Sequence, residues 1–170
     1  MRLKTLTAIV GLGLASIISF SVPAISQELV LGAGYSEFSR PGSEDSALIS
    51  AEYQHSPFWE QGRFSAAFAA AADVQTTGDL FVGVGAVGRW QLQRGWFVET
   101  SVLPGAYFEN VQLNDLGSTF EIRSALAVGR SLPNGNAISL ALAHKSNAST
   151  ADINPGVNSL LLRYHMPLNR

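Results

Sequence analysis

The chain has 170 residues, 46% of them hydrophobic and only 14% charged, and it contains no cysteine. A charged fraction well below the roughly 25% of soluble globular domains, with a mean hydropathy of +0.16, argues against a disordered chain and a disulfide-stapled secreted domain. The net charge of −2 and the lack of a Lys/Arg run argue against nucleic acid as a partner.

Residues 1–26 have the features of a secretory signal peptide. The segment begins with Arg2 and Lys4, continues with an apolar stretch at 6–20 and ends in small residues that suit cleavage. The alternative is a retained membrane anchor, but the apolar stretch is shorter than the roughly 20 residues of a helical span. We therefore predict that residues 27–170 form one exported domain.

Beyond Gln27, apolar residues alternate with polar or small ones, which is the period of a β-strand. Leu140 and Leu142, for example, alternate with Ala141 and Ala143. Several alternating stretches reach 11 residues or more, which is long for a soluble sheet but suits a tilted membrane-spanning strand of about 9–11 residues. The predicted strands cover residues 28–38, 45–55, 63–75, 79–92, 96–110, 119–132, 136–147 and 157–168.

The two faces of these strands differ in character. One face is apolar, and the other carries small residues and charges of both signs, such as Arg89, Glu99, Glu121 and Arg123. In an outer-membrane barrel the apolar face meets lipid and the charges pair inside a narrow lumen. The sequence therefore predicts an all-β fold, an eight-stranded antiparallel transmembrane β-barrel in the outer membrane.

Two soluble architectures compete with the barrel. A soluble sandwich would turn the charged face to water and the apolar face to a second sheet, but export and the long strands favour the membrane. A lipocalin-like binder needs large apolar residues around an interior cavity, whereas the alternation puts small and charged residues inside. Aromatic residues near the predicted strand ends fit the girdles of a membrane barrel: Tyr35, Phe38, Tyr53, Trp59, Trp90, Trp96, Tyr107 and Tyr164.

Cofactor and metal signals are weak. Residues 83–88 spell GxGxxG, but a dinucleotide site needs a helix after the glycines, and here they lie within a predicted strand. His55, His144 and His165 lie on separate strands, and Asp152 with His144 is too sparse a pair for a metal site. We expect no cofactor and no metal.

The sharpest cluster of reactive side chains is His144, Ser146 and Asn158. Residues two apart on a strand project to the same face, so His144 and Ser146 share one side. If the last two predicted strands form a hairpin, Asn158 begins the next strand on that face near His144. A hydroxyl, an imidazole and a group that orients the imidazole form the arrangement of an acyl-transfer nucleophile.

The predicted position of this cluster points to a lipid substrate. His144 and Ser146 share the face of Leu140 and Leu142, which points outward in a barrel. With both termini in the periplasm, the strand at 136–147 ends near the outer leaflet. Polar groups facing hydrocarbon are costly unless they have a use, and a lipid ester could reach them there without leaving the membrane. The alternative is that the His144 and Ser146 side chains simply contact lipid headgroups and water and have no catalytic role.

Four short stretches resemble the lipid A 3-O-deacylase (PagL) family: FEIRS at 120–124, NG at 134–135, HKSNA at 144–148 and NPG at 154–156. The resemblance implies an outer-membrane barrel that hydrolyses the ester-linked acyl chain at position 3 of lipid A, so lipopolysaccharide is the expected partner. By the same resemblance Ser146 is the nucleophile and His144 the general base. Asn147, with a loop backbone amide at Ser149, donates to the oxyanion.

The chain departs from the family where its triad acid falls, because Asn158 occupies that position. In a serine protease, exchange of the triad Asp for Asn costs about 10⁴ in turnover. An Asn carbonyl can still orient the imidazole but lacks the charge that stabilises imidazolium. Asp152 could replace the acid only if its loop folds back. The expectation is an esterase with reduced activity.

The competing function is a non-catalytic small barrel, structural or adhesin-like, that retains an idle His–Ser pair. An enzyme should hold a His144 ring nitrogen within about 3 Å of the Ser146 oxygen, beside a groove on the outer wall. An idle barrel needs neither. The sequence leaves a homodimer open.

Overall fold

The structure, a computed structural model, describes residues 27–168, so the predicted signal peptide lies outside the described residues. This range contains nine β-strands and two short 3₁₀ turns, and none of its helices is long and apolar enough to cross a membrane. The strands are β1 (Glu28–Phe38), β2 (Ser46–Gln54), β3 (Trp59–Gln61), β4 (Phe64–Gln75), β5 (Leu80–Gln91), β6 (Trp96–Phe108), β7 (Phe120–Ser131), β8 (Ala137–Ser146) and β9 (Val157–Pro167).

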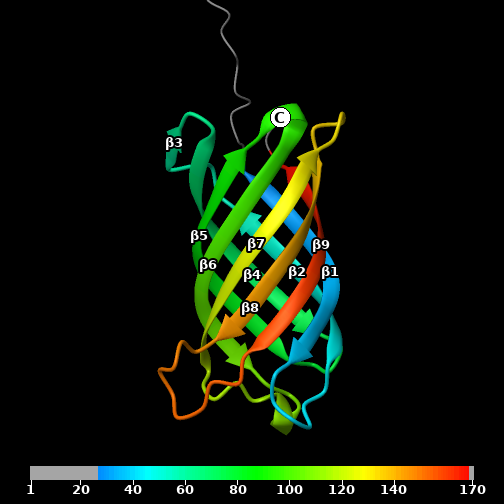
Figure 1. The fold of residues 1–170 in the computed structure, drawn as a ribbon, viewed down its shortest axis with the longest axis vertical. Helices are drawn as coiled ribbons and strands as arrows, with labels where there is room; N and C mark the ends of the chain where they lie inside the picture. Colours follow the sequence, from blue (N-terminus) through cyan, green and yellow to red (C-terminus); the bar gives the residue numbers. More distant parts are fainter. Residues whose placement is uncertain (1–26, 169–170) are drawn as a thin grey trace, which may run out of the picture.

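All strands except β3 close into a tilted cylinder (Figure 1). The sheet order is β2-β1-β9-β8-β7-β6-β5-β4-β3, and β2 also pairs with β4, so the sheet closes on itself. Every pairing is antiparallel. Closure leaves no strand edge among these eight, which is what a barrel needs in lipid, where no water can satisfy the backbone. The predicted fold class is confirmed.

The predicted strand limits agree with the observed ones to within two residues at every end. The strands end where turn-forming residues interrupt the alternation: Gly95 and Gly135 adopt φ of 77° and 83° in two tight turns. The sequence did not predict β3, a three-residue strand that pairs only with β4.

The cylinder has an outer end and an inner end. We call the end that carries the connections 39–45, 76–79, 109–119 and 147–156 the outer end. At the opposite, inner end the Leu168 N–H donates to the carbonyl of Gln27 at 2.7 Å, so the first and last described residues meet there. The two longest connections, 109–119 and 147–156, lie at the outer end, and two of the three inner connections are tight turns, the third being 55–63, which contains β3. Longer outer loops are typical of outer-membrane barrels.

The outside of the cylinder is apolar. Each of the eight barrel strands contributes large hydrophobic side chains to it, among them Phe68, Val84, Leu142 and Leu162, each more than 60% exposed. In water such a surface would be an aggregation hazard, but in a bilayer it faces hydrocarbon. The alternation therefore assigns the faces correctly.

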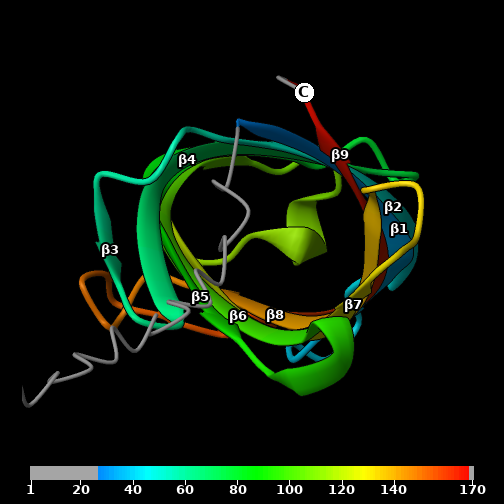
Figure 2. The same cartoon turned by 90° about the horizontal axis from the view of Figure 1, so that it is seen from above.

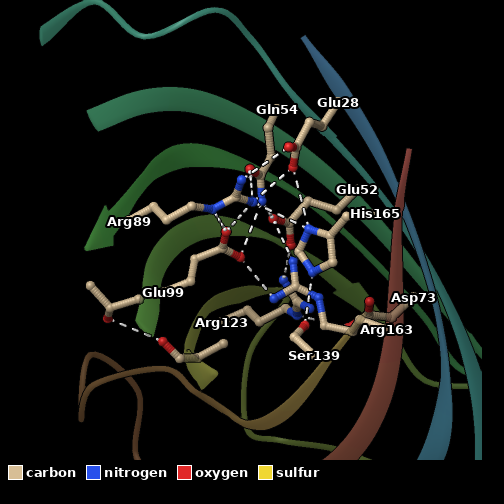
Figure 3. Close-up of polar contacts among 12 residues, drawn as sticks. Glu28, Glu52, Gln54, Asp73, Arg89, Glu99, Arg123, Ser139, Arg163 and His165 are labelled. Atoms are coloured by element: carbon tan, nitrogen blue, oxygen red, sulfur yellow. Dashed lines mark hydrogen bonds and ion pairs between the residues drawn. The ribbon is translucent and has the colours of Figure 1, made fainter. Parts of the chain in front are cut away.

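The lumen holds a network of buried charges (Figure 3). Arg89 contacts Glu28 and Glu99 at 2.7 and 2.6 Å, and Arg163 bridges Glu99 and Glu52 at 2.9 and 3.1 Å. Charges removed from water are tolerated when they are paired and hydrogen-bonded. The network comprises four carboxylates and four cations: Glu28, Glu52, Asp73, Glu99, Arg89, Arg123, Lys145 and Arg163.

Loop 109–119 folds across the outer end of the barrel, and Figure 2 shows it inside the ring of strands. The fully buried Asn114 anchors it, with Nδ2 donating to Asp79 Oδ2 at 2.6 Å and to the Glu44 carbonyl at 3.2 Å. Phe38, Phe81, Tyr107, Leu116 and Val157 form an apolar cluster beneath the loop. The lumen is therefore covered by protein at this end.

The prediction of aromatic girdles is wrong at two positions. Phe38 and Tyr107 point into the barrel and are buried, whereas the other six residues proposed for the girdles are exposed on the outside. Phe38 and Tyr107 lie at the outer ends of β1 and β6, where loop 109–119 offers an apolar cluster. Both residues also continue the inward alternation of their strands, Phe38 with Ser36 and Tyr107 with Leu103, so proximity to a strand end was the wrong criterion and the alternation the right one.

Candidate active site

His144 and Asn158 lie next to each other on the outer wall, near the outer end of the barrel. They are direct cross-strand partners of β8 and β9, and both are exposed. The distance between His144 Nδ1 and Asn158 Oδ1 is 2.8 Å. Because an amide oxygen can only accept, this hydrogen bond requires the proton on Nδ1 and leaves the lone pair of Nε2 free. That is the tautomer required of a general base.

Ser146 is the last residue of β8, two positions beyond His144, and is half-buried. Within residues 27–168 its hydroxyl makes no hydrogen bond, so the close contact with His144 expected of an enzyme is not formed. Contacts between a nucleophile and its base are often long before substrate binds and then tighten. The structure thus joins the base to its orienting group and leaves the hydroxyl unengaged.

Gly156 packs against the imidazole. Its φ is +70°, and a Cβ added to it would lie 2.9 Å from His144 Cε1 and 3.4 Å from Nε2. A side chain at this position would therefore displace the ring. From the sequence, Gly156 was noted only as part of the NPG stretch, and its contact with the His144 ring was not predicted. A glycine beside the predicted site is nevertheless a signal for close approach.

Asn147 is fully buried and organises the loop at 147–156. Its Nδ2 donates to the carbonyls of Leu116 and Ile153 at 3.0 and 2.7 Å, and its Oδ1 accepts from the Ser149 N–H at 2.9 Å. Its own N–H donates to Asn154 Oδ1 at 3.0 Å. The side-chain amide of Asn147 and the backbone amide of Ser149 are thus engaged within the protein rather than directed at the outer wall.

The N–H of Ala148 differs from its neighbours. Ala148 and Ser149 both adopt positive φ, 52° and 62°, which folds the chain tightly just after Ser146. In the described residues the Ala148 N–H has no acceptor, whereas the Asn147, Ser149 and Thr150 N–H groups all have one. The loop therefore leaves one backbone donor unpaired two residues after the serine.

A shallow groove of about 560 Å³ runs down the outer wall from His144 and Asn158. The row of His144 and Asn158 also contains Ser124. The next row, farther from the outer end, contains Leu142, Leu126 and Thr100. Ser124 is the cross-strand partner of His144 on β7. Neither the Thr100 nor the Ser124 hydroxyl was predicted from the sequence, although a polar residue within an otherwise apolar alternation is a detectable signal. The groove suits a molecule with a polar end and a hydrocarbon tail.

Asp152 does not act on His144 in this structure. It lies in loop 147–156 and is exposed, and the position it would occupy at Nδ1 is taken by Asn158. The loop does not fold back because Asn147 and Asn154 hold it in another conformation. The alternative acid named from the sequence is thus not brought to the site.

The other histidines lie elsewhere. His165 is fully buried in the lumen, where Nε2 lies 2.8 Å from Ser139 Oγ and Nδ1 lies 3.3 Å from Glu28 Oε2 (Figure 3). This has the connectivity of a Ser–His–acid triad, but its serine is buried and its acid is held by Arg89. His55 lies on the outer wall toward the inner end. Within the described range no group of three His, Cys, Asp or Glu residues could hold a metal.

Comparisons with known proteins agree with the barrel fold. A family model, described as Lipid A 3-O-deacylase (PagL), matches residues 38–167. The crystal structure of the outer membrane enzyme PagL superposes with a TM-score of 0.66 at 18% identity, covering 83% of this chain and 99% of that one. The crystal structure of Neisserial surface protein A gives 0.54 at 8% identity, covering 84% of this chain and 97% of that one.

A de novo designed transmembrane β-barrel also superposes, with a TM-score of 0.54 at 7% identity over 84% of this chain and 96% of that one. No curated protein matches the sequence. The homodimer left open by the sequence gains no support from these comparisons. The family match covers more than half of the residues and the barrel agrees with it, so the chain belongs to the lipid A 3-O-deacylase (PagL) family and is an outer-membrane barrel.

Proposed function

We propose that this protein is an outer-membrane esterase that removes an ester-linked acyl chain from the lipid A part of lipopolysaccharide. The observation that carries the proposal is the 2.8 Å hydrogen bond between His144 Nδ1 and Asn158 Oδ1. It holds the imidazole as a base on the outer wall, two residues from an unengaged serine hydroxyl. The matching family model of lipid A 3-O-deacylases and the similar crystal structure of the outer membrane enzyme PagL support lipid A as the substrate class.

The proposed reaction has two halves. Ser146 Oγ attacks the ester carbonyl while its proton moves to His144 Nε2, and collapse of the tetrahedral intermediate expels the sugar alcohol, which takes that proton. Water then attacks the acyl-serine with the same base, and the free fatty acid leaves. Throughout, the Nδ1 proton stays in its hydrogen bond to Asn158, which orients the ring.

The oxyanion that forms in each half needs N–H donors. The family resemblance nominates Asn147 and the amide of Ser149, and both would have to exchange their present partners to serve. The Ala148 N–H needs no such exchange. We therefore assign Ala148 as a donor to the oxyanion in the present loop conformation, with Asn147 and Ser149 holding the turn that presents it.

Substrate orientation follows from the groove. The acyl chain would lie against Leu126 and Leu142, toward the middle of the hydrocarbon layer, and the ester would lie at the level of His144. Sugar and headgroup would then stay at the membrane surface beside loop 147–156. No part of the substrate has to leave the bilayer, which removes the cost of exposing its acyl chain to water.

Ser146→Ala tests the function. Purified protein in detergent is mixed with lipopolysaccharide, and released fatty acid is measured by mass spectrometry. Loss of the nucleophile should lower turnover by at least about 10³-fold. Ser131→Ala is the matched control, because it removes an exposed hydroxyl from the inner end of β7 and should leave turnover unchanged.

A second function is favoured by one observation, the absence of a hydrogen bond on the Ser146 hydroxyl in the described residues. It is a non-catalytic barrel, structural or adhesin-like, in which His144 and Ser146 are idle. This alternative predicts no acyl release by the unmodified protein, or a release that Ser146→Ala does not change. Either result would replace the esterase with the idle barrel.

A further inference from the structure

Asn158 has a neighbour on its other side. The side chains of a cross-strand row on one face of a sheet lie about 4.5–5.5 Å apart at Cβ. In the row that contains the site, Asn158 is opposite His144 on β8 and opposite Glu37 on β1. Because the barrel closes β1 against β9, the tenth residue of the first strand stands next to the second residue of the last one.

Glu37 has the properties of an unengaged acid. It lies on the outer face of β1 and is exposed. In the described part of the chain its carboxylate makes no hydrogen bond or ion pair, and it is not among the residues with further contacts. Asp45, an acid in the following loop, is already engaged, since its Oδ1 accepts from the Phe38 N–H at 2.9 Å.

The side-chain amide of Asn158 can adopt two orientations, and Glu37 can favour one of them. With Oδ1 on His144, the ring carries its proton on Nδ1 and Nε2 is basic. If the amide were turned over, Nδ2 would donate to Nδ1, the proton would move to Nε2, and the ring could not accept the serine proton. The two ends of the amide are nearly isosteric, so its neighbours must choose between them.

A carboxylate is an acceptor only. Placed beside Asn158 on the side away from His144, it can bond only the NH2 group, and it thereby holds Oδ1 toward the imidazole. It also supplies negative charge one residue beyond the position where the family has its acid. The described residues give Asn158 Nδ2 no other acceptor.

From this juxtaposition we infer that Glu37 is a positioning residue, a displaced acid that acts through Asn158. It fixes the amide of Asn158, and through it the tautomer of His144, so that the relay runs from β1 across β9 to β8. The inference rests on the proposed esterase function for its kinetic consequence. Its structural consequence, the tautomer of His144, does not depend on activity.

Glu37→Gln tests the relay, because glutamine is of equal size but is uncharged and can donate as well as accept. We expect kcat for lipopolysaccharide to fall about tenfold while KM changes less than twofold. Glu109→Gln is the matched control, since Glu109 is an exposed acid at the same end of the barrel, just after β6 and away from Asn158. It should keep the kcat of the unmodified protein.

A second test places Glu37→Gln in an Asn158→Glu variant, to distinguish action through Asn158 from a role of Glu37 in folding or substrate binding. There a carboxylate would bond His144 directly, so kcat should rise and Glu37→Gln should no longer lower it. A loss that persists in this background, or one that appears in KM alone, would mean that Glu37 serves the fold or binds substrate, and the relay would be wrong.

A direct measurement uses the full-length barrel in detergent micelles with ¹⁵N-labelled histidine, at an alkaline pH where imidazoles are neutral. The unmodified protein should show His144 with its proton on Nδ1, and Glu37→Gln should increase the Nε2–H form, whereas Glu109→Gln should not. An unchanged tautomer overturns the inference even if the esterase is real. If acyl release persists in Ser146→Ala, the proposed esterase mechanism is wrong. In that case the tautomer of His144 still tests whether Glu37 orients the Asn158 amide.

Discussion

Gly156 shows how one residue without a side chain can define a catalytic geometry. Two constraints meet there: the backbone adopts φ of +70°, and the His144 ring occupies the space where a Cβ would be. The ring therefore rests on the backbone of the neighbouring loop while Asn158 holds its Nδ1. Both contacts limit rotation of the imidazole about its side-chain bonds.

Gly156→Ala should reduce acyl release at least tenfold, because the added methyl group would push the ring out of line with Ser146. Gly62→Ala provides the matched control: Gly62 also has positive φ, 61°, but has nothing within 4 Å of an added Cβ. Both changes carry a similar backbone cost, about 1 kcal/mol. Equal turnover of the two variants would show that the contact with His144 does not matter.

At the scale of elements, loop 147–156 and loop 109–119 support each other. The Asn147 amide bonds the carbonyl of Leu116 in one loop and that of Ile153 in the other, and Gly117 packs so closely on Ile153 that no Cβ would fit. The loop that follows the nucleophile is thus fixed to the one that covers the lumen.

Asn147→Ala should loosen this pair of loops without unfolding the barrel. Each lost hydrogen bond is worth about 1 kcal/mol, which is enough to increase local opening severalfold. We expect faster proteolytic cleavage within 147–156 and a lower kcat, with little change in the barrel's unfolding midpoint. Asn134→Ala, in a tight turn at the inner end, is the control. If proteolysis of the two variants is equally slow, Asn147 does not hold the loop.

At the scale of the whole molecule, buried ion pairs connect the strands through the lumen, beside the apolar clusters of the interior. Arg163 is 3% exposed and bridges Glu52 and Glu99, which Arg123 and Arg89 also contact. Strands β2, β5, β6, β7 and β9 are thereby connected through the interior. Removal of one partner leaves buried charge uncompensated, which typically costs 3–5 kcal/mol.

Arg163→Met should therefore lower the free energy of unfolding by about 3 kcal/mol, measured by urea titration of the barrel in lipid vesicles. Arg40→Met is the matched control. Arg40 lies 3.9 Å from Asp115 at the exposed outer end, and such pairs contribute at most about 1 kcal/mol. Similar losses for the two variants would mean that the lumen network does not stabilise the barrel.

The sequence by itself determined the eight barrel strands, their limits to within two residues and the face on which the alternation places each residue. Alternation with period two is a local property of an extended chain, so Leu140, Leu142 and His144 had to share a side whatever their partners were. The spacing of His144 and Ser146 and the hairpin to Asn158 follow from the same local geometry.

Only the tertiary structure decided what lies across the closure of the barrel and what the loops contact. Glu37 is far from Asn158 in sequence and meets it because β1 pairs with β9. Asn147 bonds Leu116, and Phe38 and Tyr107 pack with Leu116, because a loop from a distant part of the chain folds over this end of the barrel. Such contacts have no local period, since they depend on how the cylinder closes and which loop covers its end.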